Sequence, residues 1–277
     1  MSSIRPLAVV TGASSGIGFS LARQLAERGF DLVVNAEDHD RLHLAARQFR
    51  EAGARVEVVQ ADLRVFEEVE RFYAAVTATR RPVAVAVLNA GVGRGGAFLD
   101  NDLADELEIV ELNVRSTVHL AKRVLRDMAA QDAGYVLVSS SISAMMPGAF
   151  QAVYNASKSF LQSFTQALQN ELKDTGISVT ALMPGPTETD IFHRADMDDT
   201  KVGQQPKDDP DQVARQGLDA LFAGRGKIVA GSAKTKAQGL AAKLVPDKVN
   251  AQMHRKMAEP GSGDRGDRGD REEEENN

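Results

Sequence analysis

Short apolar segments of strand length alternate along this chain with longer segments in which apolar residues recur at helical spacing. This alternation is typical of repeated β-α-β units, whose strands form a parallel sheet. Most of the short segments are continuously apolar, as expected of strands covered by helices on both faces. The expected strands are Leu7–Val10, Leu32–Asn35, Val56–Gln60, Val83–Leu88, Tyr135–Ser139, Ser178–Leu182 and Lys227–Val229. The pattern predicts an α/β fold with a doubly wound, mostly parallel seven-stranded sheet.

Helices are expected between these strands, because apolar residues recur there at i, i+3 and i+4 and glycines stand where the helices would end. The expected helices are Ile17–Arg28, Arg41–Ala52, Phe66–Thr79, Leu103–Gln131 and Val153–Asp174. Residues 190–212 are polar and contain Pro206 and Pro210. We interpret them as a mobile loop over the carboxyl edge of the sheet.

Three regions follow from this pattern: a main domain over 1–233, an amphipathic extension over 234–257 and a tail over 258–277. In the extension, apolar residues from Leu240 to Met257 recur at near-helical spacing beside a basic face, with an interruption at Pro246. We interpret this amphipathic pattern as a pair of helices packed on the main domain. The alternative interpretation is a surface that contacts acyl chains or a membrane. The tail has almost no apolar side chains, so we expect disorder.

Composition excludes several classes of protein. With no Cys among 277 residues, the chain has no disulfides, thiolate zinc site or cysteine nucleophile. The tail carries most of the net charge of −6, and the nearly neutral remainder argues against nucleic-acid binding. His39 and His43 have metal-ligand spacing but no third ligand nearby, so we predict no metal. Without a secretory signal or a spanning segment, we expect a cytoplasmic protein.

A glycine-rich segment directly follows the first expected strand and opens the first helix. Gly12, Gly16 and Gly18 permit a tight turn and a close approach of the backbone to a pyrophosphate, whose charge would meet the free N–H groups of the helix N-terminus. Glycine clusters are more often plain turns. Here, however, Glu37 stands nineteen positions beyond Gly18, after the second strand, which is the dinucleotide-binding arrangement.

The glycine spacing, G-x-x-x-G-x-G, is one of several motifs that occur in a particular order. The others are Asp62, Asn89-Ala90-Gly91, Asn113, Ser141, Tyr154-x-x-x-Lys158, Pro184-Gly185 and Thr189. Together they resemble the short-chain dehydrogenase/reductase family in its common single-domain form, over about residues 4 to 231. The resemblance implies a Rossmann-like fold, and makes 1–233 a dinucleotide-binding and catalytic domain.

The chemistry of these residues can also be considered without the family. Tyr154 and Lys158 lie four apart on an expected helix and share a face, so the ammonium could lower the pKa of the phenol. Such pairs are also commonplace on exposed helices. Ser141 ends the fifth strand, where its hydroxyl could donate to a substrate carbonyl oxygen. Asn113, between Leu112 and Val114, indicates a buried hydrogen bond.

The resemblance assigns roles to these positions. Asn113, Ser141, Tyr154 and Lys158 would form a catalytic tetrad in which Tyr154 moves a proton as hydride passes between a nicotinamide ring and a carbonyl or secondary alcohol. Lys158 would also bond the nicotinamide ribose, and Asn113 would hold a water linked to it. The implied cofactor-binding residues are Gly12, Ser14, Ser15, Gly16, Ile17, Gly18, Glu37, Asp62, Leu63, Asn89, Ala90, Gly91, Tyr154, Lys158, Pro184, Gly185, Thr187 and Thr189.

The cofactor choice favours NAD(H), because Glu37 and Ser15 stand where members that prefer the phosphorylated cofactor usually carry a basic residue. NADP(H) stays possible, since Ala36 stands where NAD-specific members have Asp and Arg41 could reach the site. Met145, Met146, Phe150 and Phe192 indicate a partly apolar substrate pocket. The alternative function is a non-catalytic dinucleotide-binding module with a partner-binding tail, but family members of that kind tend to lose the tyrosine or lysine.

We also expect a homodimer or homotetramer. The two long helices, 103–131 and 153–174, are apolar over more than one face, and the family commonly pairs them. The apolar residues from Phe160 to Leu172 exceed what one contact with the sheet would cover. These residues are Phe160, Leu161, Phe164, Ala167, Leu168 and Leu172. The remaining partner is a small-molecule carbonyl or alcohol; nucleic acid is excluded and a membrane surface is disfavoured.

Overall fold

The structure is a computed structural model that describes residues 5–241 and 245–263. Its seven strands form one parallel sheet in the order β3-β2-β1-β4-β5-β6-β7. The strands are β1 (Leu7–Thr11), β2 (Asp31–Ala36), β3 (Val56–Gln60), β4 (Val83–Leu88), β5 (Gly134–Ser139), β6 (Ile177–Pro184) and β7 (Lys227–Ala230). The predicted doubly wound α/β fold is confirmed.

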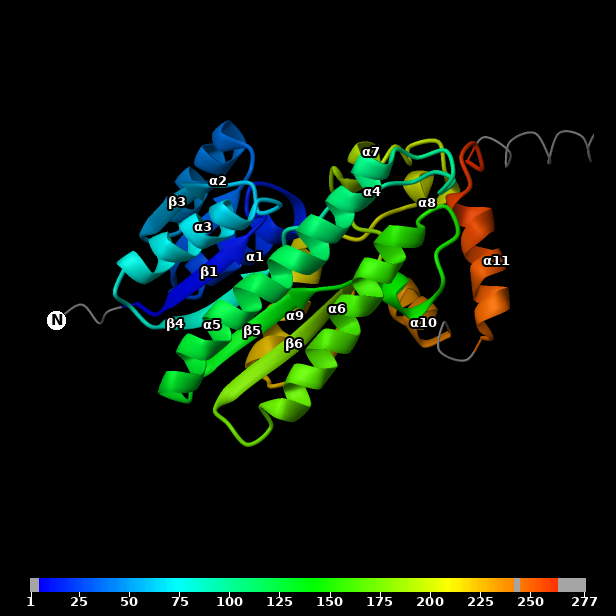
Figure 1. Cartoon of the computed structure of the whole chain (residues 1–277). Coiled ribbons are helices and arrows are strands. Elements are labelled where there is room, and N and C mark those ends of the chain that lie inside the picture. The colour runs from blue at the N-terminus through cyan, green and yellow to red at the C-terminus, as the bar shows by residue number, and fades with distance from the viewer. Residues whose placement is uncertain (1–4, 242–244, 264–277) are drawn as a thin grey trace, which may run out of the picture.

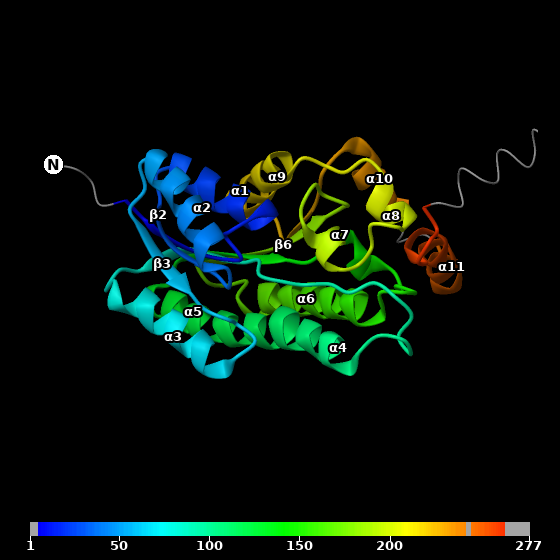
Figure 2. The same ribbon diagram turned by 90° about the horizontal axis from the view of Figure 1, so that it is seen from above.

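Helices cover both faces of the sheet, which lies between two helical layers in Figure 2. One layer comprises α1 (Gly16–Glu27), α2 (His39–Glu51) and α9 (Pro210–Phe222), and the other α3 (Phe66–Ala78), α5 (Thr117–Gln131) and α6 (Ala152–Glu171). Each layer buries its own apolar cluster against the sheet: Phe49 and Leu218 belong to one, Phe72 and Met128 to the other. The strands are therefore apolar on both sides, which explains their continuous sequence pattern.

The strand order reverses between β1 and β4, where neighbouring connections leave toward opposite sides of the sheet. In open parallel sheets, ligands bind at such a switch point, beyond the carboxyl ends of the strands. The glycine-rich segment after β1 and the Asn89-Ala90-Gly91 segment after β4 both lie there. The topology thus brings together motifs that are almost 80 residues apart in sequence.

The expected long helix 103–131 is divided into three parts. α4 (Leu103–Ile109) is followed by a π-helical segment, Val110–Ser116, and then by α5. Asn113 lies inside the π-helical segment and is fully buried. Such insertions interrupt the regular ladder of i to i−4 hydrogen bonds and occur often at functional sites. Hydrophobic periodicity alone does not reveal one extra residue in a turn.

The prediction of a loop over 190–212 is wrong in part. The segment contains two short helices, α7 (Ile191–Arg194) and α8 (Lys201–Gln204), and α9 begins within it at Pro210. The signal for α9 was present: the Asp209 carboxylate accepts a hydrogen bond from the Asp211 N–H, and Pro210 occupies the first turn. Ser20 and Arg23 of α1 bind the same Asp211, which holds α9 against α1.

The C-terminal extension forms α10 (Ala233–Ala241) and α11 (Asp247–Ala258), at the right-hand end of Figure 1. The expected interruption at Pro246 separates them, whereas Lys243 and Leu244 of the predicted stretch lie outside the described residues. The predicted tail begins too early, because residues 258–263 are packed: the backbone N–H groups of Gly261 and Gly263 donate to Asp199. The rest of the tail lies outside the described residues. Within the described part of the chain, no helix could span a membrane.

Candidate active site

Two adjoining cavities lie at the carboxyl edge of the sheet. The larger, about 710 Å³, is lined by the ends of β1, β2, β3 and β4, and the smaller, about 280 Å³, by the segments after β5 and β6 and by α6 and α11. Ile17, Asn89, Gly91, Gly93, Thr189 and Ile191 line both cavities. Every predicted cofactor-binding residue lines at least one of them. We refer to them as the nucleotide cavity and the substrate cavity.

The glycine-rich segment has a geometry that only glycine satisfies. Gly12 and Gly16 have φ angles of +66° and +54°, in the left-handed region. A Cβ atom on Gly18 would lie 2.1 Å from the Gly12 carbonyl oxygen, and one on Gly16 would lie 2.7 Å from Thr189 Cγ2. The backbone therefore forms a cradle at the N-terminus of α1 that suits a pyrophosphate, and the residues present fit a dinucleotide.

Thr11, at the end of β1, attaches the neighbouring segment to this cradle. Its hydroxyl accepts hydrogen bonds from the backbone N–H groups of Asn89 (2.9 Å) and Ala90 (3.0 Å). The Ser139 hydroxyl donates to the Asn89 side chain at 2.9 Å. Three strands thus fix the floor shared by the two cavities. No motif in the sequence indicates this role for Thr11 or Ser139.

Tyr154 and Lys158 project from α6 toward the substrate cavity, beside Ser141. Burial raises the pKa of the Tyr154 phenol, and a hydrogen bond with Ser141 acts against this increase. Burial also lowers the pKa of Lys158 to about 8. The Lys158 ammonium donates to the Ser139 carbonyl at 3.0 Å and lies 5.7 Å from the centre of the Tyr154 ring. The pKa of the phenol is therefore raised by burial, whereas the sequence pattern predicted a decrease caused by Lys158.

Ser141 has two functions in this geometry. Its oxygen accepts a hydrogen bond from the Ser143 N–H at 3.1 Å, capping the short helix Ile142–Met145. The same hydroxyl lines the substrate cavity and bonds Tyr154. The structure therefore gives Ser141 a capping role in addition to the substrate contact that its place after the fifth strand predicts. Capping orients the hydroxyl, because the helix N–H group fixes where its oxygen lies.

Asn113 lies behind the cavities rather than in their lining. Its side chain bonds both backbone groups of Val92 at 2.9 Å and donates to the Ser157 hydroxyl at 3.0 Å. This clamp holds the segment that passes Tyr154, where a Cβ atom on Gly93 would lie 3.1 Å from the ring. The structure thus shows a positioning contact for Asn113. The water-holding role implied by the family stays a prediction.

The segment after β6 forms one wall of the substrate cavity, through Pro184, Gly185, Thr187 and Thr189. Thr187 is buried and donates to the Gly185 carbonyl at 2.9 Å. The Asp208 N–H donates to the Pro186 carbonyl at 2.8 Å, and its buried carboxylate accepts a hydrogen bond from Thr235 of α10 at 2.5 Å. α10 therefore stiffens the wall against which a nicotinamide ring would lie.

The C-terminal extension also encloses the substrate cavity, which sequence reasoning missed. From α10 and α11, the lining residues are Gln238, Asn250, Met253, His254, Met257 and Ala258. His254 is nearly buried and bonds the Ala149 carbonyl at 2.9 Å, which attaches α11 to the segment before α6. Apolar residues at helical spacing indicated a packed face in the sequence. They could not indicate what the face covers.

The four apolar residues expected in the pocket divide into two pairs. Met146 and Phe192 line the substrate cavity. Phe150 instead packs with the small cluster around Ala195, Met197 and Ala258, and Met145 lies beside Gly239. The ring centroids of His39 and His43 lie 4.3 Å apart on α2, with the rings tilted by 47°. Within the described residues, no group of three potential ligands could hold a metal ion.

The fold and the two joined cavities define a dinucleotide-binding α/β protein. The family model described as short chain dehydrogenase matches residues 6–200, so the chain belongs to the short-chain dehydrogenase family. A Streptomyces coelicolor protein named as a ketoacyl reductase is 38% identical over 187 residues, covering 66% of this chain and 71% of that protein.

Solved structures are similar as well. A short-chain dehydrogenase from Sphingobium yanoikuyae in complex with NADPH is 30% identical, with a TM-score of 0.73, covering 81% of this chain and 87% of that one. A short-chain dehydrogenase/reductase from Burkholderia phymatum has a TM-score of 0.80 at 22% identity, covering 94% of this chain and 99% of that one, a likeness of fold. The relatives support a nicotinamide cofactor and leave its phosphorylation state open.

Proposed function

We propose that this chain is a nicotinamide-dependent oxidoreductase that interconverts an apolar ketone and the corresponding secondary alcohol. The observation that carries the proposal is the convergence of Ser141, Tyr154 and Lys158 in the lining of the substrate cavity. Lys158 and Tyr154 lie beside Gly91 and Gly93, which line both cavities. A cofactor bound along the nucleotide cavity would supply or accept the hydride. The cradle at Gly12, Gly16 and Gly18 would hold its pyrophosphate, and the wall at Pro184–Thr189 would support its ring.

The chain's own residues handle the proton. In reduction, the Tyr154 hydroxyl gives its proton to the carbonyl oxygen, while Ser141 donates a hydrogen bond to that oxygen as negative charge develops. In oxidation, the phenolate takes the proton of the alcohol. Lys158 places a positive charge beside the phenol, where it favours the phenolate. Asn113 keeps the segment from Gly91 to Gly93 against Tyr154 through its two bonds to Val92.

The substrate class follows from the lining of the substrate cavity. Its apolar lining includes Met146, Ile191, Phe192, Val202, Met253 and Met257. Its polar side chains away from the catalytic group include Gln151, Asn250 and His254. Such a cavity favours an acyl or cyclic ketone with few polar groups over a small hydroxy acid. The ketoacyl reductase relative from Streptomyces coelicolor supports the acyl possibility.

The proposed cofactor is NAD(H) rather than NADP(H). Glu37 lines the nucleotide cavity after β2, where a carboxylate can accept hydrogen bonds from ribose hydroxyls and repels a 2′-phosphate. The relative from Sphingobium yanoikuyae was solved with NADPH, so family likeness does not support this choice. It is supported by the charge at Glu37.

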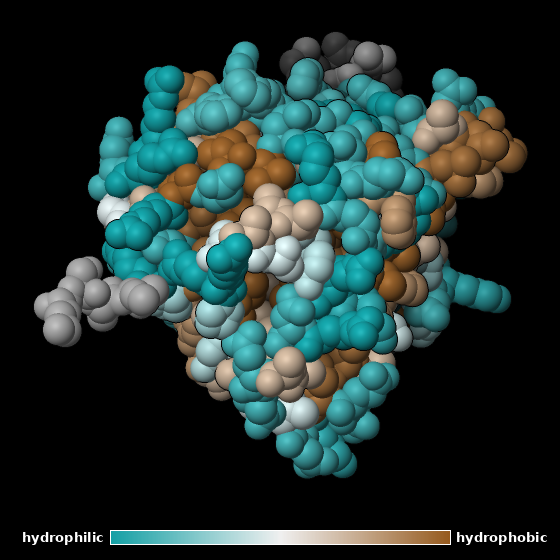
Figure 3. Space-filling view, turned by 60° about the vertical axis from the view of Figure 1, so that its left-hand side comes forward, coloured by the Kyte–Doolittle hydropathy of each residue, from teal (hydrophilic) through white to brown (hydrophobic). Residues whose placement is uncertain are grey.

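We also propose a homodimer or homotetramer through α4, α5 and α6. Leu103, Leu107 and Phe160 on α4 and α6 are 69%, 51% and 41% exposed, although Leu161 of the expected surface is buried. Brown apolar areas interrupt the mainly teal surface in Figure 3. A symmetric partner would cover such side chains. A monomer by light scattering at micromolar concentration would contradict this assembly.

Tyr154→Phe tests the reaction. The ring keeps its volume, so folding and NADH binding should be unchanged, while kcat on any accepted ketone falls about 10²- to 10⁴-fold. Tyr73→Phe is the matched control, because it removes a hydroxyl that bonds Asp127 away from the site. Rates are measured by the absorbance of the reduced nicotinamide over a panel of apolar and polar ketones. A Tyr154→Phe enzyme that keeps more than about a tenth of wild-type kcat would refute the role.

A further inference from the structure

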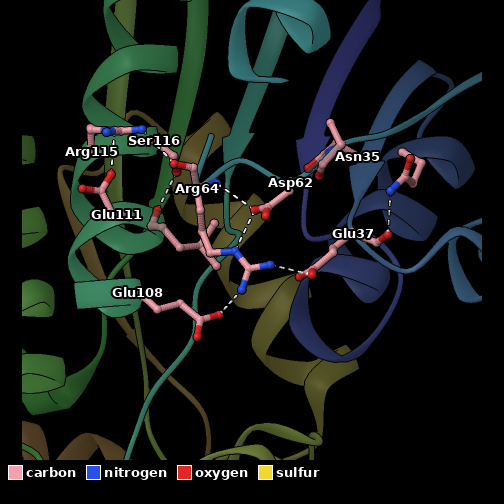
Figure 4. Close-up of polar contacts among 11 residues, drawn as sticks. Asn35, Glu37, Asp62, Arg64, Glu108, Glu111, Arg115 and Ser116 are labelled. Atoms are coloured by element: carbon pink, nitrogen blue, oxygen red, sulfur yellow. Dashed lines mark hydrogen bonds and ion pairs between the residues drawn. The ribbon is translucent and has the colours of Figure 1, made fainter. Parts of the chain in front are cut away.

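Arg64, in the segment between β3 and α3, lies at the centre of a group of carboxylates beside the nucleotide cavity (Figure 4). Its Nη2 atom is 2.5 Å from Glu37 Oε1 and its Nε atom is 2.7 Å from Asp62 Oδ1. The third guanidinium nitrogen, Nη1, pairs with Glu108 of α4. All three nitrogens of the guanidinium are thus occupied by carboxylates from three separate elements.

The carboxylates cover the guanidinium. Glu37, Asp62 and Glu108 line the nucleotide cavity, whereas Arg64 is not part of the lining. The Arg64 side chain is 28% exposed and that of Glu37 is 64% exposed. Three carboxylates and one guanidinium leave a local charge of −2. A 2′-phosphate placed there would therefore meet negative charge first.

The ion pair between Arg64 and Asp62 keeps both of its charges at physiological pH. Although burial opposes the change, hydrogen bonds from the Arg64 side chain and backbone lower the pKa of Asp62. The hydrogen bond that Arg64 donates to Asp62, together with the three negative charges, raises the pKa of Arg64. The Arg64–Asp62 pair is therefore a fixed part of the cluster.

Other arginines near the cavity have different partners, and Arg194, which also lines it, pairs with Asp190 at 3.8 Å. Arg41 bonds Asp190 at 2.6 Å, and Arg94 pairs with Asp105 and Asp196. Arg64 is therefore the cation in contact with Glu37, the residue expected to accept the ribose hydroxyls. The planar guanidinium of Arg is suited to a phosphate, because it presents parallel N–H groups to two oxygens.

We propose that Arg64 is able to bind the 2′-phosphate of the phosphorylated cofactor, and that its ion pair with Glu37 prevents this binding in the wild type. The pair of residues thereby determines the cofactor choice. This inference rests on the proposed function only in that the cavity must bind an adenine dinucleotide. In the wild type, the Glu37 carboxylate pairs with Arg64 Nη2 and repels a 2′-phosphate. Without the Glu37 charge, Arg64 Nη2 binds the 2′-phosphate on the adenosine ribose, and the chain accepts the phosphorylated cofactor.

The test measures binding rather than turnover, with two probes that differ by one phosphate: adenosine 5′-monophosphate and adenosine 2′,5′-bisphosphate. Calorimetry gives the ratio of their affinities for the folded full chain. Glu37→Gln should shift the ratio toward the bisphosphate by at least about tenfold, because a charge-assisted hydrogen bond becomes available. Glu37→Gln combined with Arg64→Gln should lose most of that shift.

Two further variants distinguish binding of the phosphate by Arg64 from the general effect of removing one negative charge from the cavity. Asp38→Asn removes a carboxylate from the lining of the same cavity, but Asp38 bonds Arg41 and not Arg64. It should shift the ratio by less than about threefold. Glu37→Gln combined with Arg64→Lys keeps the cation without its planar fork, so the ratio should be intermediate. If Arg64→Gln unfolds the chain, the double variant Glu37→Gln, Arg64→Lys provides the test when compared with Glu37→Gln alone.

An equal shift in Glu37→Gln with and without a basic residue at position 64 would overturn the inference and leave the proposed function intact. No shift in Glu37→Gln would overturn it as well. If the wild type bound neither probe, both the inference and the proposed function would be refuted.

Discussion

Replacing Lys158 by Met should stabilise the folded chain while removing turnover. Lys158 is 5% exposed, and burial lowers the pKa of its ammonium from 10.5 to about 8. A difference of about 2.5 pKa units corresponds to about 3 kcal/mol of destabilisation at pH 7, where both the folded and the unfolded chain carry the proton. Met has a similar length and no charge to desolvate.

Part of this gain is offset by the lost hydrogen bond to the Ser139 carbonyl, about 1 to 1.5 kcal/mol. The variant should therefore unfold with a free energy about 2 kcal/mol above that of the wild type at pH 7. NADH affinity and kcat should both fall, because the ammonium is proposed to bond the cofactor ribose and to support the phenolate. Stability traded for function is common at active sites.

The pH dependence gives a second readout. Between the folded pKa of about 8 and the unfolded value of 10.5, the unfolded chain binds more protons, so wild-type stability rises with pH. The advantage of Lys158→Met should consequently shrink by about 2 kcal/mol between about pH 7 and pH 9.5.

The assay is urea unfolding followed by far-ultraviolet circular dichroism, since the chain has no Trp. Lys173→Met, an exposed lysine after α6, is the control and should show neither effect. A Lys158→Met protein that is less stable than the wild type at pH 7, or an advantage independent of pH, would show that this reasoning about burial is wrong.

Two further predictions concern single side chains. Ser141→Ala should keep more activity than Tyr154→Phe, because water can replace one donor to the oxyanion whereas the proton donor has no substitute; equal losses of kcat would contradict this order. Burial lowers the pKa of His254 below 6.5, so the stability that neutral His254 contributes is present above pH 6.5 and is lost as the pH falls toward the folded value. His254→Gln should remove this loss in thermal unfolding between about pH 7 and pH 5, and an unchanged pH profile would refute it.

The elements whose signals are local could be predicted from the amino-acid sequence. Strands buried on both faces are continuously apolar, and the glycines of the cradle are required by the left-handed φ angles of Gly12 and Gly16. The spacing of Tyr154 and Lys158 placed them on one face of a helix. These features depend on a few neighbouring residues, so they can be predicted without knowing how the chain packs.

Tertiary structure alone decided what those elements meet. Arg64 and Glu108 are 44 residues apart, and only the approach of α4 to the end of β3 brings them together. In the same way, His254 reaches Ala149 across 105 residues, which makes α11 a wall of the substrate cavity. The pKa of Tyr154 also depends on packing. The Lys158 ammonium four residues later predicted a lowered pKa, whereas burial of the phenol raises it. Desolvation and long-range ion pairs depend on packing in three dimensions, which local spacing in the chain does not encode.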